Sequence, residues 1–218
     1  MGKLNIISRS SEPFLNRMQA AELLAQKLEK LTDKNTVILG IPRGGIVIAK
    51  NIARKLSVDF DIVLSRKIPA PFNPEFAIGA IGENGKVFLN KTALCEIGAK
   101  QDYIKKASRH ESEEIKRRAK LYRKVKSKLV LEEKTVIISD DGVATGATMQ
   151  AAIWAVRQEK PSKVIIALPV GPYDAIVKLA DESDEILCLR IPEFFSAVGQ
   201  FYIDFPQIED NQVLELLK

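Results

Sequence analysis

The chain has 218 residues, 46% of them hydrophobic, which suffices for the core of one α/β domain with an elaboration. No apolar run reaches the roughly 20 residues of a membrane span, and no apolar leader follows Met1, so we expect a cytoplasmic protein without a membrane partner. The net charge of +5 is not spread evenly along the chain. Residues 101–128 hold eleven basic and four acidic residues (+7), and the rest of the chain has a net charge of −2. The overall positive charge therefore does not by itself indicate that the protein binds nucleic acid.

The first predicted element is a helix over residues 12–31, where apolar residues recur at helical spacing. A buried strand over 36–41 follows and runs into Pro-Arg-Gly-Gly at 42–45, after which a helix is predicted over 46–56. The glycines let the backbone approach an anion closely, and Arg43 adds a cation to the same turn. Taken alone, residues 42–45 are also compatible with an ordinary turn that leads into a helix without binding a ligand.

A third strand is predicted over residues 59–64, and it leads to two cations, Arg66 and Lys67. These cations suit either a solvated basic turn or an anion site. Three prolines follow within residues 69–74, a density that excludes a helix or a central strand. An Asn-Gly pair at 84–85 between two strand patterns then predicts a β-hairpin.

Residues 101–129 contain no Pro or Gly, and their apolar side chains form one stripe that only Glu111 interrupts. This pattern predicts a long amphipathic helix within an insertion over about 91–130. The simplest interpretation is a solvated helix that packs by one side on its own domain. A dimer contact and an RNA-binding face are the alternatives.

The most informative stretch is residues 136–149, in which a β-branched run ends at Asp140 and Asp141 and continues into a loop rich in Gly and Thr. An alanine-rich helix is predicted over 150–157, so the stretch is a strand, a loop and a helix. Such a loop directs backbone N–H groups and hydroxyls to one point beside a helix N-terminus, which suits a phosphate. Adjacent acids at the end of a buried strand suit hydroxyls or a metal beside that phosphate.

Two further strands are predicted over residues 163–170 and 185–190, with a helix over 173–180 between them. Apolar strands that alternate with helices predict a parallel sheet covered on both faces, with ligands at the carboxyl ends of the strands. Residues 191–206 are rich in aromatic side chains, and the last helix is predicted over 208–217.

The run Asp-Asp-Gly-Val-Ala-Thr-Gly-Ala-Thr, which begins at Asp140, resembles the phosphoribosyl pyrophosphate (PRPP) signature of the type I phosphoribosyltransferases. The resemblance implies that Asp140 and Asp141 approach the ribose hydroxyls, with Mg²⁺ held mainly by PRPP beside them. It assigns the 5′-phosphate to Ala144, Thr145, Gly146, Ala147 and Thr148. Gly142 departs from the family pattern, which usually has an apolar residue there.

The resemblance continues in the loop after the first core strand. It implies that Arg43, Gly44 and Gly45 bind pyrophosphate, and that the Pro42–Arg43 peptide bond is cis. It also implies a mobile catalytic loop after the third strand, from which Arg66 and Lys67 reach the pyrophosphate oxygens.

The C-terminal region has two open interpretations. In the family a small hood covers the acceptor base, and residues 191–218 then contribute Phe195 and Asp204 to base binding. Alternatively, this region is a core edge that holds the last helix. Because Ala144 stands where the 6-oxopurine branch carries an acid, we expect adenine or a non-standard base as acceptor, with Glu75 or Asp204 as the general acid or base.

We therefore expect one α/β domain over residues 1–218, a phosphoribosyltransferase-like parallel sheet covered by helices on both faces. The implied activity is Mg²⁺-dependent transfer of 5-phosphoribosyl from PRPP to a nitrogenous base with release of pyrophosphate, by a homodimer in nucleotide salvage. We expect no nucleic-acid partner. The alternative function is a PRPP-sensing regulator that binds nucleic acid through the basic helix at 101–129.

Overall fold

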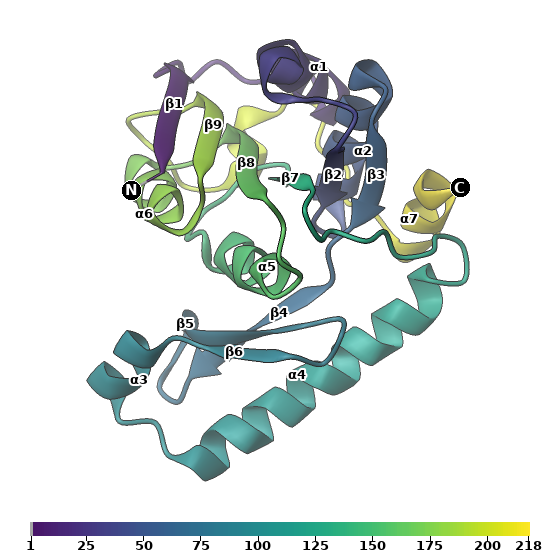
Figure 1. Cartoon of the computed structure of the whole chain (residues 1–218). Helices are drawn as coiled ribbons and strands as arrows, with labels where there is room; N and C mark the ends of the chain where they lie inside the picture. Colours follow the sequence, from purple (N-terminus) through teal and green to yellow (C-terminus); the bar gives the residue numbers. More distant parts are fainter. Residues whose placement is uncertain (1) are drawn as a thin grey trace.

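The computed structural model describes residues 2–218, apart from the side chains of Pro74, Glu75, Lys91 and Glu96. Its centre is a six-stranded sheet in the order β1-β9-β8-β7-β2-β3, in which all neighbouring strands are parallel (Figure 1). The strands are β1 (Lys3–Ser8), β2 (Thr36–Gly40), β3 (Asp59–Ile62), β7 (Thr135–Ser139), β8 (Lys163–Val170) and β9 (Glu185–Arg190). The predicted fold class is confirmed.

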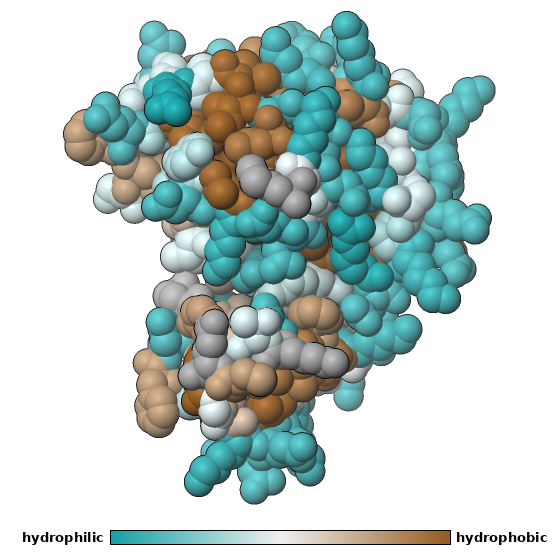
Figure 2. Space-filling view, turned by 60° about the vertical axis from the view of Figure 1, so that its left-hand side comes forward, coloured by the Kyte–Doolittle hydropathy of each residue, from teal (hydrophilic) through white to brown (hydrophobic). Residues whose placement is uncertain are grey.

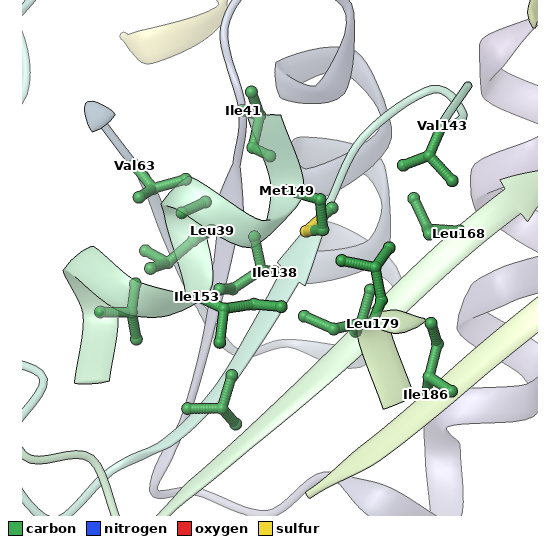
Figure 3. Close-up of a cluster of buried hydrophobic side chains, with 14 of the residues drawn as sticks. Leu39, Ile41, Val63, Ile138, Val143, Met149, Ile153, Leu168, Leu179 and Ile186 are labelled. Carbon is green, nitrogen blue, oxygen red and sulfur yellow. The ribbon is translucent and has the colours of Figure 1, made fainter. Parts of the chain in front are cut away.

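Helices cover both faces of this sheet, because alternate residues of each buried strand point to opposite sides. Leu39 and Ile138 pack with Met149 and Ile153 of a helix on one face (Figure 3), whereas Ile38 packs on the opposite face. The first face is covered by α5 (Ala147–Arg157) and α6 (Tyr173–Glu182), and the second by α1 (Arg17–Leu28) and α2 (Gly44–Leu56).

A second, antiparallel sheet lies outside this core, in the order β4-β5-β6. It consists of β4 (Ser65–Ala70), β5 (Asn73–Gly82) and β6 (Val87–Leu89), and is followed by α3 (Lys91–Ile97) and the long helix α4 (Gln101–Tyr122). We call residues 65–122 the small-sheet unit. Its sheet packs between α5, through Trp154, and α4, through Ile104 (Figure 1).

The C-terminal segment returns to the main body. The short 3-10 helix η2 (Val198–Phe201) is followed by α7 (Asp210–Leu217), which packs on Tyr122 near the end of α4. Hydrophobic side chains gather in two areas of the surface shown in Figure 2, one on the upper body and one on the part below it. Within the described residues, no helix combines the length and apolar character that crossing a membrane requires.

Several predicted elements need correction. The first helix begins at Arg17 rather than residue 12, because Asn16 caps it and the preceding Phe14 exchanges backbone hydrogen bonds with Phe201 and Ile203. Helix α1 is followed by a short 3-10 helix, η1 (Glu29–Leu31), which ends at residue 31, the predicted end of the first helix. Strand β1 was not predicted.

Two corrections concern the small-sheet unit. The proline-rich segment was predicted as a mobile loop without a central strand, but most of it forms strands. Pro69 is tolerated because β4 is an edge strand, whereas β5, the middle strand, includes Pro74 as its second residue. Helix α4 ends at Tyr122 rather than 129, since the guanidinium of Arg123 turns inward to Asp61 and Glu83. The predicted hairpin at 84–85 is confirmed, with Gly85 at a φ of 74°.

Candidate active site

Two loops meet at the carboxyl edge of the large sheet, because β2 and β7 are neighbours in register. A Cβ atom on Gly44 would lie 1.9 Å from Asp141 Oδ2, and one on Gly45 would lie 2.8 Å from the Cα atom of Asp140. These positions therefore require glycine for the close approach of the two loops, in addition to any contact with an anion. The Pro42–Arg43 peptide bond is cis, as the resemblance implied.

The acid pair at the end of β7 has an asymmetric environment. Asp141 Oδ2 accepts a hydrogen bond of 2.8 Å from Arg17 Nε, and both side chains are nearly buried. Asp140 has no basic partner at this distance among the described residues, and its Oδ1 accepts the N–H of Asp141 at 2.9 Å. Burial raises the pKa of the Asp140 carboxyl well above its ordinary value, and the adjacent charge of Asp141 raises it further. Burial also raises the pKa of Asp141, while Arg17 opposes this shift.

The loop after the acid pair leads directly into α5. Gly146 occupies the N-cap position in a left-handed conformation with a φ of 77° and offers no side-chain cap, while Thr145 Oγ1 accepts the N–H of Ala147 at 3.4 Å. The side chains of Thr145 and Thr148 are exposed at the same point, as is Ala144. The helix N-terminus and the two hydroxyls are therefore accessible to an anion, which is the arrangement that phosphate binding needs.

The C-terminal segment covers the other side of Asp141. Tyr202 Oη donates a 2.7 Å hydrogen bond to the carbonyl oxygen of Asp141, and the ring of Phe205 stacks on that of Tyr202. The Arg17 guanidinium lies 3.7 Å from the centre of the Phe205 ring and donates to the carbonyl oxygen of Pro206. The acid pair is thus joined to a segment about sixty residues away in the sequence.

Gly142 has a structural explanation. A Cβ atom there would lie 2.7 Å from Val198 Cγ1, and the residue has a φ of +156°. The side chain of Val198 fills the space that an apolar residue at 142 would otherwise take. Glycine at position 142, which departs from the family pattern, therefore makes room for the C-terminal segment that carries Val198.

Two pockets are each bordered by residues of both loops. One, of about 450 Å³, is bordered by Arg17, Arg43, Asp141 and Phe205, among others. The guanidinium of Arg43 is half-buried at its edge and pairs with Glu209 at 3.0 Å.

The other pocket, of about 460 Å³, lies between Pro42, the start of β4, α4 and the start of α5. Its polar lining residues are Ser65, Arg66, Lys67, Glu111, Arg118 and Thr148. Arg66 Nε donates to Glu111 Oε2 at 2.6 Å, which accounts for the charged residue that interrupts the apolar stripe of α4.

The structure brings together most of the predicted site residues. Asp140, Asp141, Gly44 and Gly45 lie in contact, with Arg43 in the same loop, while Arg66 and Lys67 border the pocket that Thr148 also borders.

The two predicted base-binding residues lie elsewhere. Phe195 stacks on Phe201 and lines a separate pocket with Arg9 and Tyr173. Asp204 is exposed, and its backbone N–H donates to the carbonyl oxygen of Leu15. The side chain of Glu75, the other expected acid or base, lies outside the described residues. The aromatic side chains beside the acid pair are instead those of Tyr202 and Phe205.

Sequence reasoning missed Arg17, Tyr202, Phe205 and Arg118. Arg17 lies in an ordinary helical pattern, and Arg118 is one of seven Lys and Arg residues in α4, so neither has a local signal. Glu111 was visible as a break in an apolar stripe. A charged residue on a buried face usually has a partner, so this break was a usable signal.

Among the described residues, no three acidic, His or Cys side chains form a cluster that could hold a metal ion. The acid pair nevertheless fits Mg²⁺ that arrives with a phosphorylated ligand. This ion is usually bound by one or two carboxylates, water and substrate phosphates. Asp140, whose carboxylate lacks a basic partner in the described structure, is the better placed of the two acids.

A parallel α/β sheet whose glycine loops and acid pair meet at one edge has an arrangement that suits a phosphorylated ligand. The model of the phosphoribosyl transferase domain matches residues 15–206, and the chain belongs to this family. It is 38% identical over 204 residues to a Mycobacterium tuberculosis protein named as a phosphoribosyl transferase, a match that covers 94% of this chain and 46% of that protein. The chain thus spans about half the length of the curated relatives it matches.

Solved structures agree with this fold. TT1426 from Thermus thermophilus is 41% identical, with a TM-score of 0.89, and the match covers 94% of this chain and 97% of that one. A Neisseria gonorrhoeae protein with bound ppGpp is 13% identical with a TM-score of 0.52, covering 99% of this chain and 97% of that one. The second likeness concerns the fold alone.

Proposed function

We propose that this chain is a phosphoribosyltransferase that moves the 5-phosphoribosyl group of PRPP to a nitrogen atom of an acceptor base and releases pyrophosphate. The observation that carries the proposal is the direct contact between the two glycine loops through Asp140 and Asp141. One loop ends at a helix N-terminus whose N-cap residue is a glycine, which suits the 5′-phosphate, and the other presents the cation Arg43, which suits pyrophosphate.

The reaction breaks the bond between C1 of the ribose and a pyrophosphate oxygen, and forms a bond between C1 and the acceptor nitrogen. Its transition state resembles an oxocarbenium ion, so the protein acts mainly by positioning the reactants and stabilising charge. Residues 144–148 hold the 5′-phosphate, and the acid pair binds the ribose hydroxyls. Arg43, Gly44, Gly45, Arg66 and Lys67 bind the pyrophosphate.

When bound, Mg²⁺ neutralises charge on the pyrophosphate. Asp140 and Asp141 are the residues that would hold the ion beside the ribose. Arg17 keeps Asp141 oriented, because its guanidinium is fixed at the same time by the carbonyl oxygen of Pro206 and by the Phe205 ring.

The acceptor belongs in the part of the pocket that Phe205 and Arg17 border, next to Asp141, while Arg43 and Gly44 of the proposed pyrophosphate loop border the same pocket. An aromatic ring at the edge of this pocket suits a flat base. Phe195 and Asp204 remain weaker candidates, since neither borders this pocket. The methyl group of Ala144 cannot exchange a proton with a purine, so we expect hypoxanthine and guanine to be poor acceptors compared with adenine or a non-standard base.

The decisive experiment has two parts. Calorimetry with PRPP and Mg²⁺ should show that Asp141→Asn weakens PRPP binding tenfold or more, about 1.4 kcal/mol, whereas the exposed control Glu215→Gln has no effect. Equal binding by Asp141→Asn and the wild type would refute the assignment of the acid pair.

The second part identifies the acceptor. Nucleobases are screened with PRPP and Mg²⁺ while pyrophosphate release is followed. Comparable turnover of hypoxanthine and adenine would contradict the argument from Ala144. Activity in nucleotide salvage, a cytoplasmic location and a homodimer stay predictions.

A further inference from the structure

Helix α4 supplies part of the wall of the pocket that contains Arg66 and Lys67. Ile115 and Arg118 border this pocket from α4, opposite Pro42 and Thr148. Figure 1 shows why the helix reaches it: α4 runs along the small sheet, and its C-terminal end rises toward the main body beside α7. The long helix is therefore part of the site as well as a support for the small sheet.

The lining of this pocket is mainly basic. Its ionisable residues are three cations, Arg66, Lys67 and Arg118, and one acid, Glu111. Glu111 is neutralised by Arg66 at 2.6 Å, and its side chain is only 12% exposed. A pocket lined by more cations than acids favours an anion.

Arg118 keeps donor groups available. Its Nε atom donates to Glu114 Oε1 at 2.9 Å, but Arg117 already binds both oxygens of that carboxylate. These two guanidinium groups lower the pKa of Glu114 to about 2, so the acid is ionised and shared between them. Within the described part of the chain, the two Nη groups of Arg118 make no hydrogen bond.

We propose that Arg118 is a fourth cationic ligand, after Arg43, Arg66 and Lys67, of the diphosphate group that the proposed function requires. The inference rests on the proposed function, because that function supplies the diphosphate. Guanidinium groups bind phosphate oxygens through paired N–H donors, and a diphosphate has enough oxygens for several of them. Arg118 would thus give the basic helix a role in substrate binding.

Two probes separate this role from a general effect on folding or charge. Pyrophosphate with Mg²⁺ tests the proposed pocket, and ribose 5-phosphate tests the loop at 144–148. In calorimetric titrations, Arg118→Gln should weaken pyrophosphate binding at least tenfold and change ribose 5-phosphate binding less than twofold. Arg118→Lys, which keeps the charge but loses the planar fork, should fall between Arg118→Gln and the wild type.

The matched control is Arg109→Gln, which removes the same charge from the same helix at a side chain that is 85% exposed. It should leave both affinities within twofold of the wild type. Equal pyrophosphate binding by Arg118→Gln and the wild type would overturn the inference and leave the proposed function intact. An equal loss for both probes would also overturn it, because it would indicate a structural role. A wild-type protein that binds neither probe would refute the proposed function and this inference together.

Discussion

The two regions that form the candidate site are built differently. The loops at the edge of the large sheet place Asp140, Asp141 and Gly44 through the backbone, because each loop follows directly from a buried strand. The small-sheet unit places Arg66 and Arg118 through packing and ion pairs with other side chains. The first region therefore depends on local geometry. The second depends on how firmly the unit is docked.

The docking of the small-sheet unit has a clear centre at Arg123. Its guanidinium donates to Asp61 Oδ1 in β3 at 2.6 Å and to both oxygens of Glu83 after β5 at 2.7 and 2.9 Å. Asp61 also accepts the backbone N–H of Leu129. One side chain thus connects the large sheet, the small sheet and the chain that leaves α4.

The largest expected effect follows from removing this connection. Arg123→Met should lower the free energy of unfolding by roughly 3–5 kcal/mol, because it leaves Asp61, which is almost fully buried, without its counter-charge. Urea denaturation measures this loss. Arg109→Met, at an exposed ion pair, is the control and should cost less than about 1 kcal/mol.

Arg123→Met also tests whether the small-sheet unit can open locally while the large sheet stays folded. Hydrogen exchange in Arg123→Met should accelerate in β4, β5 and α4 more than in β7 and β8, since local opening is governed by local contacts. Uniform acceleration across both regions would contradict the distinction and indicate a single cooperative unit.

The regions also differed in how far the sequence could predict them. The loops at 42–45 and 140–148 were predictable, because their Gly, Asp and Thr residues are adjacent in sequence and the strands before them are continuous apolar runs. The hairpin at 84–85 was predictable for the same reason. A short segment determines each of these features.

The remaining features depend on long-range pairing. Nothing near Arg17 indicates its bond to Asp141, and nothing near Tyr202 indicates its bond to the backbone of the same residue. β1 has a weak pattern and is stabilised by pairing with β9. The strand state of residues 65–70 depends on the edge position of β4 and on α4, where Tyr103 Oη donates to the carbonyl oxygen of Pro69.

A smaller effect should distinguish the two acids at the sheet edge. The pKa of Asp140 is raised by burial and then by the charge of Asp141, so the folded protein holds a proton that the unfolded chain releases. The tighter binding of this proton by the folded state stabilises the protein. The stabilisation is complete below the ordinary aspartate pKa of about 4 and is lost as the pH rises through the raised pKa. Asp140→Asn removes the loss and keeps an oxygen that can accept the Asp141 N–H.

We therefore expect Asp140→Asn to be more stable than the wild type at pH 8, by on the order of 1 kcal/mol, with a smaller difference near pH 4. Urea denaturation at both pH values measures the difference, and Asp59→Asn at an exposed position should show none. The gain in stability should accompany a loss of PRPP affinity, which is the behaviour of a group kept for function. A pH-independent difference would show that burial of the Asp140 charge is not its cause.

The smallest expected effect concerns nucleic acid and decides between the enzyme and a regulator. The excess of basic residues over 101–128 is smaller within α4 itself, where seven basic and four acidic residues give +3. Arg109, Arg117 and Arg118 pair with acids of the same helix, and Arg123 turns into the protein just after it. The positive charge of α4 is therefore partly neutralised by acids of the same helix and partly directed toward the site. The electrostatic potential on the outer surface of α4 is correspondingly weak. We expect no RNA binding tighter than about 1 μM at physiological salt, the range of non-specific binding.

Fluorescence anisotropy with a labelled RNA over a salt series measures this affinity, and a sub-micromolar affinity that falls steeply with salt would favour the regulator. Lys105→Gln with Lys106→Gln, at exposed positions of α4, would then weaken RNA binding while leaving pyrophosphate affinity unchanged.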